Sequence, residues 1–349
     1  MKLREQVPLA PLTTLGVGGP ARYFVDAETE VDIREALEFA AARQFPVFVL
    51  GGGSNLLVAD AGFAGLVLKV RLRGVDRVAE RLDVTYQVAA GEDWDAFVAR
   101  ATQENCAGIE CLSGIPGSVG ATPVQNVGAY GQDVAETISE VVALDRRTME
   151  VRTIRTAECG FGYRSSIFNT TDRENYIILR VSFVLRNGDN PAVRYGDLQK
   201  YLRSKGSHQP SLQQVRDAVR EIRHSKAMLL VPGEDDARSA GSFFKNPVVL
   251  HEEYEELAER LKSRGLDLPT YPADGGLRKL SAAWLVEQAG FHKGYERGAA
   301  GISSKHALAI VNRGGATAEE IVALKDEVQA RVFGEFGIAL QPEPVFLGF

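Results

Sequence analysis

Apolar residues recur along the chain with two periods, and each period predicts a different kind of element. In residues 31–44 the apolar positions fall on one face of a helix. Helical patterns also cover residues 94–102, 211–224, 252–264, 282–288 and 317–336. Short apolar or alternating runs predict strands at residues 46–50, 65–70, 82–90, 138–144 and 176–185. Because both kinds of element are present along the chain, we predict a fold of the α/β (α+β) class.

Glycine and proline interrupt this pattern in two places. Residues 114–131 read GIPGSVGATPVQNVGAYG. They cannot form a regular helix or a central strand, because glycine weakens both elements and proline lacks a backbone donor. An irregular loop of this length inside a compact domain is usually functional. Residues 187–191 have the composition of a turn, and we place a domain boundary between about residues 188 and 210.

The composition is that of a globular protein with enough apolar material for a sizeable core. Hydrophobic residues make up 45% and charged residues 25% of the chain. A length of 349 residues fits two or three domains. The formal net charge is −6 and the sequence has no basic stripe, which argues against a nucleic-acid partner.

The cysteines and the hydropathy pattern indicate in which cellular compartment the protein works. Cys106, Cys111 and Cys159 are odd in number and form no CxxC pair, so we predict neither a disulfide framework nor a zinc or other metal site. The first residues lack the apolar segment of a signal peptide. No run approaches the roughly 18 apolar residues of a membrane span. We therefore expect a cytoplasmic protein with no membrane partner. We also expect a monomer, although neither the cysteines nor the hydropathy pattern bears on the oligomeric state.

A glycine-rich segment follows the strand predicted at residues 46–50. It consists of Gly51, Gly52, Gly53, Ser54 and Asn55. Glycine allows a positive φ and brings consecutive N–H groups close to an anion, so a diphosphate suits this segment. A plain glycine turn would have the same sequence, and the segment matches neither the GxGxxG nor the P-loop pattern.

The longer loop has the same chemistry on a larger scale. Its glycines let a flat cofactor lie against the backbone, and its amides can bind phosphate or the edge of a ring. A mobile surface loop is the alternative, but the regular apolar positions indicate packing. The candidate cofactor contacts are Gly114, Ile115, Pro116, Gly117, Ser118, Gly120, Gln125, Asn126 and Gly128.

Together the two segments resemble the FAD-binding domain of the vanillyl-alcohol-oxidase type. The order of residues in both segments resembles that of the UDP-N-acetylenolpyruvoylglucosamine reductase family. This resemblance extends from LTTLGVGG at residues 12–19 to the C-terminus. The resemblance implies FAD as cofactor, NADPH as reductant, and a role in peptidoglycan precursor synthesis. It also implies a C-terminal substrate-binding domain.

Three further motifs match the family and place its catalytic residues. The motif GYRSSIF at residues 162–168 puts the family's arginine at Arg164, which by itself would be read as a surface residue. AGSFFKNP at residues 240–247 puts the proton-donating serine at Ser242, and no GxSxG elbow suggests an acylated nucleophile. The terminal Leu-x-x-Glu pattern puts the catalytic glutamate at Glu343. The chain departs from the family there, because Pro344 and Val345 stand where Val-Arg is usual.

The resemblance implies a mechanism for these residues. Hydride passes from the flavin to the vinyl carbon of the enolpyruvyl ether, and negative charge builds on the substrate carboxylate. Arg164 would stabilise that charge, which is often the largest catalytic contribution. Glu343 would align and polarise the carboxylate, and Ser242 would deliver a proton to the α carbon.

The resemblance also suggests substrate contacts, each with a structural alternative. Lys226 ends a predicted helix and could bind diphosphate, or be a solvated helix end. Tyr195, in the sequence Tyr-Gly-Asp-Leu, resembles a loop that closes over the diphosphate; otherwise it is a core tyrosine. Asn246 matches a substrate-binding asparagine, Tyr271 could stack on uracil, and His306 is either a polar contact or a structural histidine. Compared with the common family pattern, the chain carries extra residues within 227–238.

We expect three parts and keep two other functions open. Residues 1–75 and 76–205 would form the FAD-binding subdomains, residues 206–336 the substrate-binding domain, and the strand at 338–349 would return to the active site. An oxidase of the same fold would lack the Arg164, Ser242 and Glu343 combination and often tethers its flavin through His or Cys. A catalytically inactive nucleotide-sugar binding protein would not need both glycine-rich segments.

Overall fold

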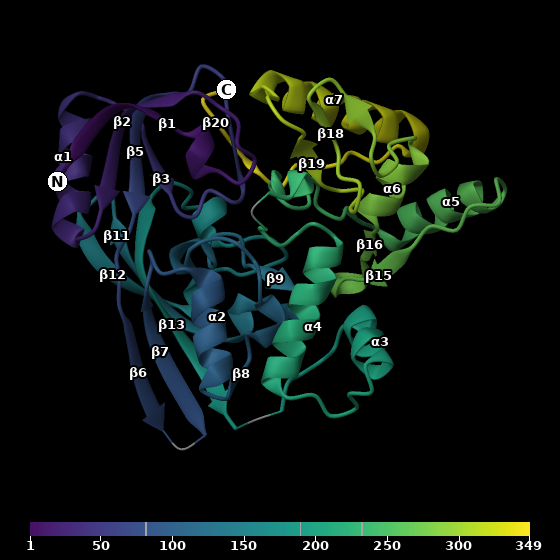
Figure 1. Ribbon diagram of the computed structural model, residues 1–349, viewed down its shortest axis with the longest axis horizontal. Coiled ribbons are helices and arrows are strands. Elements are labelled where there is room, and N and C mark those ends of the chain that lie inside the picture. The colour runs from purple at the N-terminus through teal and green to yellow at the C-terminus, as the bar shows by residue number, and fades with distance from the viewer. Residues whose placement is uncertain (81, 189, 232) are drawn as a thin grey trace. The chain divides into compact units, whose positions relative to one another are not determined.

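The computed structural model describes residues 1–80, 82–188, 190–231 and 233–349. They form two compact units, each built from segments that are far apart in the sequence (Figure 1). Unit 1 contains Met1–Val7, Ala21–Gly53 and Phe63–Leu229. Unit 2 contains Pro8–Pro20, Ser54–Gly62 and Leu230–Phe349.

The first sheet of unit 1 has the strand order β1-β2-β5-β3. Its strands are β1 (Leu3–Pro8), β2 (Pro20–Ala27), β5 (Phe63–Val70) and β3 (Val47–Leu50). Strand β5 pairs in parallel with both β2 and β3. Helix α1 (Glu30–Ala42) starts at a capping box formed by Thr29 and Asp32. Its buried face, which includes Ile33 and Leu37, joins the same apolar core as Leu66 and Leu68 of β5.

The second sheet of unit 1 is antiparallel, with the order β12-β11-β13-β7-β6. Its strands are β12 (Glu150–Arg155), β11 (Ile138–Asp145), β13 (Tyr176–Asn187), β7 (Asp83–Ala89) and β6 (Val75–Glu80), and the short β8 (Cys106–Ala107) also pairs with β13. Helix α2 (Trp94–Gln103) packs Trp94 and Phe97 against Phe183 of β13. Helices α3 (Gly196–Ser204) and α4 (Leu212–Ser225) share a smaller apolar cluster.

The glycine-rich loop at residues 114–131 lies in unit 1 and is mostly irregular. It contains only a 3-10 turn (Val119–Ala121) and the two-residue strand β9 (Gly128–Ala129), which pairs with β10 (Gln132–Asp133). The prediction that this segment forms neither a regular helix nor a central strand is therefore confirmed.

Unit 2 combines short strands with helices α5 (His251–Lys262), α6 (Ala282–Gln288) and α7 (Ala318–Phe336). Strand β20 (Val345–Leu347) pairs in parallel with β4 (Leu56–Val58). Two small antiparallel sheets have the orders β14-β16-β15 and β17-β18-β19. Their strands are β14 (Val248–Val249), β16 (Arg278–Leu280), β15 (Thr270–Pro272), β17 (Glu296–Arg297), β18 (Ala300–Ile302) and β19 (Ile310–Asn312). The core of unit 2 contains Leu15, Val17 and Leu57 together with residues of the C-terminal segment.

The predicted helices and strands agree with the structure to within a few residues. Ser211 caps α4 as its position suggested, since its hydroxyl accepts the N–H of Gln214. The sequence pattern missed β1, β2, β6 and β12, whose alternation is weak. Within the C-terminal segment at residues 338–349, only Val345–Leu347 form a strand. Asp189 of the predicted turn and Pro232 of the extra segment lie outside the described residues.

One sequence interpretation is corrected by helix α3. Tyr195 and the three residues after it were expected in a loop, but Gly196 begins α3 and Tyr195 is its N-cap. This helix is hard to predict from the sequence because it is short and its apolar face consists of two buried residues, Leu198 and Leu202. The three-part division at residues 75 and 205 stays a prediction, although α4, expected in the substrate-binding domain, packs within unit 1.

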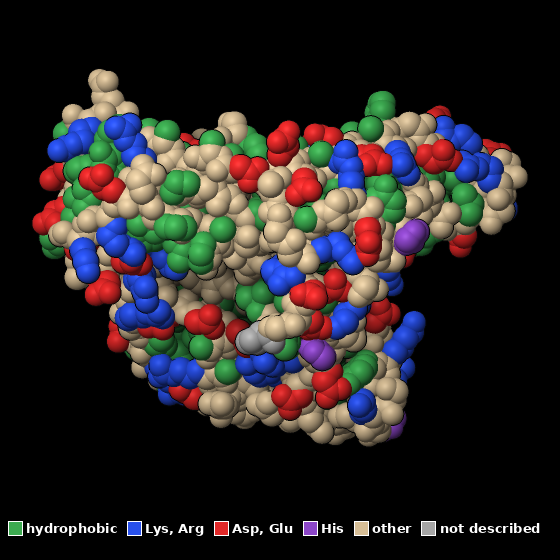
Figure 2. All heavy atoms as spheres, turned by 45° about the horizontal axis from the view of Figure 1, so that its top comes forward, with side chains coloured by type: hydrophobic (Ala, Val, Ile, Leu, Met, Phe, Trp, Pro, Cys, Tyr) green, Lys and Arg blue, Asp and Glu red, His purple; other side chains and the backbone are tan. Residues whose placement is uncertain are grey.

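The surface carries both signs of charge. On the face drawn in Figure 2, Lys and Arg side chains are interspersed with Asp and Glu, as the modest net charge suggests. Among the helices of the described residues, none combines the length and apolar character that crossing a bilayer requires.

Candidate active site

The two predicted glycine-rich segments approach each other in unit 1. A Cβ atom on Gly52 would lie 2.5 Å from the Cα of Gly117, and one on Gly51 would lie 2.7 Å from the hydroxyl of Ser118. Both distances are shorter than side chains tolerate, so only glycine permits this approach. Two backbone segments about sixty residues apart in the sequence therefore lie in direct contact, and glycine-rich backbone of this kind suits the close approach of a dinucleotide such as FAD.

The loop is anchored at the start of α2. Gly117 accepts the N–H of Trp94 at 3.1 Å, and the N–H groups of Val119 and Gly120 donate to the carbonyls of Glu92 and Ala90. A Cβ on Gly120 would lie 2.5 Å from the Cβ of Ala90, which explains glycine at this position by packing alone. The loop is therefore held at defined backbone positions, as the sequence pattern of apolar residues indicated.

Asn126 joins the loop to the segment that carries Arg164. Its side chain is 5% exposed, donates to the carbonyl of Gly162 at 3.0 Å, and accepts the N–H of Ala135 at 3.1 Å. Asn126 has a φ of 45°, a conformation that asparagine tolerates better than most residues. Its amide is thus engaged with the protein on both its donor and its acceptor side, so the predicted cofactor contact would be additional to this structural one.

Arg164 lies in a tight turn and reaches the same loop. The turn is closed by two hydrogen bonds between the backbones of Gly162 and Ser165. Arg164 has a φ of 53°, which is uncommon for a residue with a long side chain and marks a strained position. Its guanidinium donates to the carbonyl of Gly128 at 2.6 Å, and its side chain is 22% exposed. The structure therefore brings two sequence-predicted motifs together within unit 1.

Ser242 and Glu343 lie on neighbouring segments of unit 2. The N–H of Glu343 donates to the carbonyl of Phe243 at 2.9 Å, and the N–H of Lys245 donates to the carbonyl of Gln341. Phe243 is fully buried, which fixes the backbone beside Ser242 in the core. The Ser242 hydroxyl is 3.1 Å from Nε2 of His306. The predicted hydroxyl, carboxyl and imidazole groups thus come from adjacent parts of one unit.

Asn55, the last residue of the glycine-rich segment at residues 51–55, contacts the segment that carries Glu343. Asn55 lies in unit 2, where its side chain donates to the carbonyl of Glu343 at 3.2 Å. In return, the N–H of Val345 donates to the carbonyl of Asn55 at 3.0 Å. The unusual Pro344-Val345 sequence therefore still provides the backbone donor that fixes Glu343. Ser54 also lies in unit 2, so the five predicted residues of this segment divide between the two units.

The remaining predicted substrate contacts are spread over both units. In unit 2, the Asn246 side chain accepts the N–H of Ala282 and so holds the start of α6, while Tyr271 is 47% exposed on β15. In unit 1, Lys226 is the C-cap of α4. Tyr195 is 37% exposed and packs edge-to-face on Tyr130 at 5.6 Å between ring centroids.

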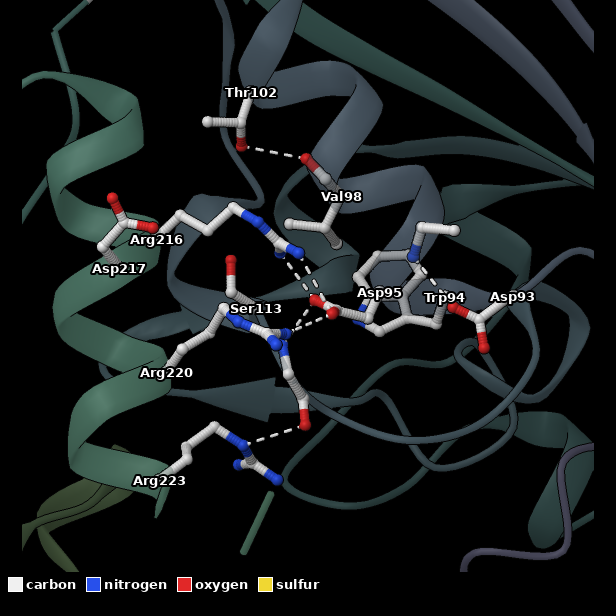
Figure 3. A network of polar contacts seen from close by, with 12 residues as sticks. Asp93, Trp94, Asp95, Val98, Thr102, Ser113, Arg216, Asp217, Arg220 and Arg223 are labelled. Carbon is white, nitrogen blue, oxygen red and sulfur yellow. Dashed lines mark hydrogen bonds and ion pairs between the residues drawn. The ribbon is translucent and has the colours of Figure 1, made fainter. Parts of the chain in front are cut away.

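Helix α4 carries a polar network that the sequence reading missed (Figure 3). Asp95 of α2 forms ion pairs with Arg216 and Arg220 and accepts the N–H of Gly114. Burial raises the pKa of Asp95, but these hydrogen bonds and charges together hold it below its ordinary value. Arg216 and Arg220 stand four residues apart in a predicted helix, so the sequence could have indicated that both lie on one face of it.

Arg223 extends the network to both ends of the glycine-rich loop. It is 7% exposed and donates to the carbonyls of Gly114 at 3.1 Å and Met228 at 2.7 Å. Its positive charge also acts on Tyr130, near the end of the loop, where it partly offsets the effect of burial on the pKa of the hydroxyl. Burial raises the pKa of Tyr130 and lowers that of Arg223. One buried guanidinium therefore holds the start of the loop and acts electrostatically on Tyr130, which packs on Tyr195.

Comparisons with known proteins identify two family domains along the chain. Residues 21–148 match the model of the FAD binding domain family, and residues 232–347 match the C-terminal domain of UDP-N-acetylenolpyruvoylglucosamine reductase. The UDP-N-acetylenolpyruvoylglucosamine reductase of Thermobifida fusca (strain YX) is 47% identical over 349 residues, which cover 99% of this chain and 98% of that protein. That of Streptomyces coelicolor is 45% identical, covering 99% of this chain and 90% of that protein.

A solved structure supports the same relationship. The crystal structure of UDP-N-acetylenolpyruvylglucosamine reductase from Thermus caldophilus matches with a TM-score of 0.68 and 26% identity, covering 99% of this chain and all of that chain. Together with the family matches, this confirms the predicted fold class, in which an FAD-binding domain is combined with a C-terminal domain of this reductase type.

Proposed function

Because this chain belongs to the UDP-N-acetylenolpyruvoylglucosamine reductase family, an FAD-binding oxidoreductase family, we propose that it makes UDP-N-acetylmuramate. It would reduce the enolpyruvyl group of UDP-N-acetylenolpyruvoylglucosamine, with NADPH as the reductant, in peptidoglycan precursor synthesis. The observation that carries the proposal is the hydrogen bond from the Glu343 N–H to the Phe243 carbonyl. It supports a site in which a carboxyl group and the Ser242 hydroxyl are held on adjacent segments.

FAD fits the residues of the glycine-rich segments. Gly51, Gly52 and Gly53 together with the loop at residues 114–128 would hold it, since the two segments are in contact at Gly52 and Gly117 and glycine-rich backbone can direct consecutive N–H groups at a diphosphate. When bound, FAD would take a hydride from NADPH and supply it to the terminal vinyl carbon of the substrate. The protein's own residues would hold the substrate, stabilise the negative charge that develops on it and deliver a proton to its α carbon.

Arg164 and Glu343 would act on the substrate carboxylate. As the vinyl carbon gains a hydride, negative charge develops over the α carbon and the carboxylate. A guanidinium offers two parallel donors to a carboxylate, so Arg164 suits this charge, and its strained backbone supports a functional position. Glu343 would align and polarise the same group from the segment fixed by Asn55.

Ser242 would complete the reaction by giving its hydroxyl proton to the α carbon. His306, 3.1 Å away through Nε2, is placed to replace or orient that proton. Tyr195, Lys226, Asn246 and Tyr271 would bind the UDP-sugar. The edge-to-face contact between Tyr195 and Tyr130 supports a link between this substrate contact and the cofactor loop.

The same proposal includes a monomer that works in the cytoplasm. Cys106, Cys111 and Cys159 are buried free thiols, as a reducing compartment permits. Burial raises the pKa of the Cys159 thiol to about 11, so this cysteine would be unreactive at neutral pH.

Reoxidation of the reduced flavin tests the reaction. The purified holoenzyme would be reduced with NADPH without oxygen and then mixed with UDP-N-acetylenolpyruvoylglucosamine in a stopped-flow instrument. We expect rapid return of the oxidised-flavin absorbance and formation of UDP-N-acetylmuramate. Reoxidation by air alone would favour an oxidase, and a protein that binds no flavin after reconstitution would contradict both enzymatic functions and favour a nucleotide-sugar binding protein.

A further inference from the structure

A short acidic segment contacts the loop that carries His306 in unit 2. The 3-10 turn Asp235–Ala237 places the Asp236 carboxylate against residues 303–304. One oxygen of Asp236 accepts three hydrogen bonds: from the Ser303 hydroxyl at 3.1 Å, the Ser304 N–H at 2.9 Å and the Ser304 hydroxyl at 2.6 Å. Three donors that converge on one carboxylate oxygen fix the local backbone firmly.

Ser303 passes this constraint to His306. Its side chain is fully buried, and its hydroxyl oxygen accepts the N–H groups of Lys305 at 3.1 Å and His306 at 3.2 Å. The same hydroxyl donates to Asp236, so both its donor and its acceptor capacity are engaged. Ser303 therefore holds the backbone of His306, and the imidazole of the same residue contacts the Ser242 hydroxyl, so contacts lead from Asp236 through Ser303 and His306 to Ser242.

Two further contacts hold the acidic segment in place. Lys305, two residues after Ser303, forms an ion pair with Glu234, two residues before Asp236. Arg238 donates from Nε to the carbonyl of Asn312 at 2.8 Å, and its own carbonyl accepts the Asn312 N–H. The segment is therefore tied both to the loop that carries His306 and to β19, and it has little freedom to move independently.

We propose that Asp236 is a positioning residue for Ser242. This inference rests on the proposed function, in which the Ser242 hydroxyl donates a proton. Such a hydroxyl rotates freely unless a neighbouring group fixes its direction, and small misplacements of a reacting group strongly lower rates. Asp236 fixes the backbone of the His306 loop, His306 fixes the Ser242 hydroxyl, and Asp236 itself touches neither substrate nor cofactor.

Stopped-flow measurements on the holoenzyme separate this role from a general loss of structure. Asp236→Ala should slow reoxidation of the reduced flavin by the enolpyruvyl substrate about tenfold or more, because Ser242 loses its orientation. Flavin content and the rate of reduction by NADPH should stay at the wild-type level. Asp236→Asn keeps an acceptor oxygen and should restore most of the rate. Asp235→Ala is the matched control, since Asp235 is the neighbouring carboxylate, is 83% exposed and pairs only locally with Arg238.

Hydrogen–deuterium exchange provides a readout that does not depend on turnover. Asp236→Ala, but not Asp235→Ala, should speed exchange of the amides of Ser304 and His306. If Asp236→Ala does not retain FAD, Ser303→Ala breaks the same path and should show the same selective slowing.

The outcomes distinguish this inference from the proposed function. Slow reoxidation with normal reduction by NADPH, rescued by Asp236→Asn, supports it. Wild-type reoxidation rates in both Asp236→Ala and Ser303→Ala, or equal slowing of both half-reactions, would overturn it. If the wild-type enzyme itself is not reoxidised by the substrate, the proposed function is wrong and this role of Asp236 is wrong with it.

Discussion

Gly52 and Arg164 occupy backbone positions that their neighbours dictate. Gly52 faces the Cα of Gly117 so closely that no side chain fits between them, and Arg164 adopts a left-handed φ that is costly for its residue type. In both cases the surrounding hydrogen bonds and packing over-determine the conformation. Positions of this kind are common at ligand sites, so they are the residues at which small changes should affect function most.

Gly52→Ala should reduce FAD binding. The new Cβ would lie 2.5 Å from the Gly117 Cα, so the two backbone segments must separate. Forced overpacking of this kind costs about 1–3 kcal/mol. The ratio of flavin to protein absorbance and the melting temperature would measure the effect. Gly334→Ala is the control, because Gly334 lies in α7 with open space around it; its flavin content should stay normal. Full flavin content in Gly52→Ala would refute the close approach.

Ser242→Ala should affect one half-reaction only. Loss of a proton donor lowers rates by about 10²–10⁴-fold, and the loss should appear in flavin reoxidation by the enolpyruvyl substrate. Reduction by NADPH should continue at the wild-type rate. Ser263→Ala, which removes an exposed hydroxyl at the end of α5, should leave both rates unchanged. Equal loss in both half-reactions of Ser242→Ala would assign Ser242 a structural role.

At the scale of elements, helix α4 organises the glycine-rich loop. Its arginines bind Asp95 of α2 and the first carbonyl of the loop. The loop has few side chains of its own with which to pack, so a neighbouring helix provides the fixed contacts. The cofactor surface thus depends on α4 as well as on the loop sequence.

Asp95→Asn should destabilise the protein in a pH-dependent way. The pKa of Asp95 lies below its ordinary 3.8, so its ionised form stabilises the fold above the unfolded pKa. That contribution is lost as the pH falls through the lower folded-state pKa. The variant should lose about 2 kcal/mol in the free energy of unfolding at neutral pH. The difference from wild type should shrink below about pH 4.

Urea unfolding followed by circular dichroism at several pH values would measure this difference. Asp217→Asn is the matched control, since Asp217 also lies on α4 but its carboxylate is exposed and accepts a hydrogen bond from Gln213 on the same helix. It should change stability little at any pH. A difference between Asp95→Asn and wild type that stays constant down to pH 3 would contradict an ion-pair origin.

At the scale of the whole molecule, each unit needs segments from distant parts of the sequence. Unit 2 takes Pro8–Pro20 and Ser54–Gly62 in addition to its C-terminal segment. Leu15 and Leu57 are fully buried in its core, and β4 is the partner of β20. The segment that carries Ser242 and Glu343 therefore depends on residues near the start of the chain.

A fragment of residues 230–349 should not fold by itself. Without Leu15, Val17 and Leu57 its core has unfilled space, and β20 lacks a pairing partner. Thermal unfolding followed by near-ultraviolet circular dichroism should show no cooperative transition for the fragment, in contrast to the full chain. A sharp transition with a native-like near-ultraviolet spectrum would show that the N-terminal segments are dispensable.

Local patterns in the sequence were enough to predict the long helices, the central strands and the residue types of the candidate site. Apolar periodicity is local, so α1, α4 and α7 could be predicted from their own residues. Glycine-rich segments and the motifs around Ser242 and Glu343 are likewise continuous strings that a sequence displays directly. Short strands such as β1 and β12, and the start of α3, were not predicted because few of their residues show a periodic pattern of apolar positions.

The contacts that these residues make could be known only from the tertiary structure. Asn55 and Glu343 are 288 residues apart, yet one holds the carbonyl of the other. Asp236 is linked to Ser242 through Ser303 and His306, and no local sequence pattern encodes these contacts. Hydrogen bonds require partners within about 3 Å, and such proximity between distant segments arises only when the whole unit packs around its core.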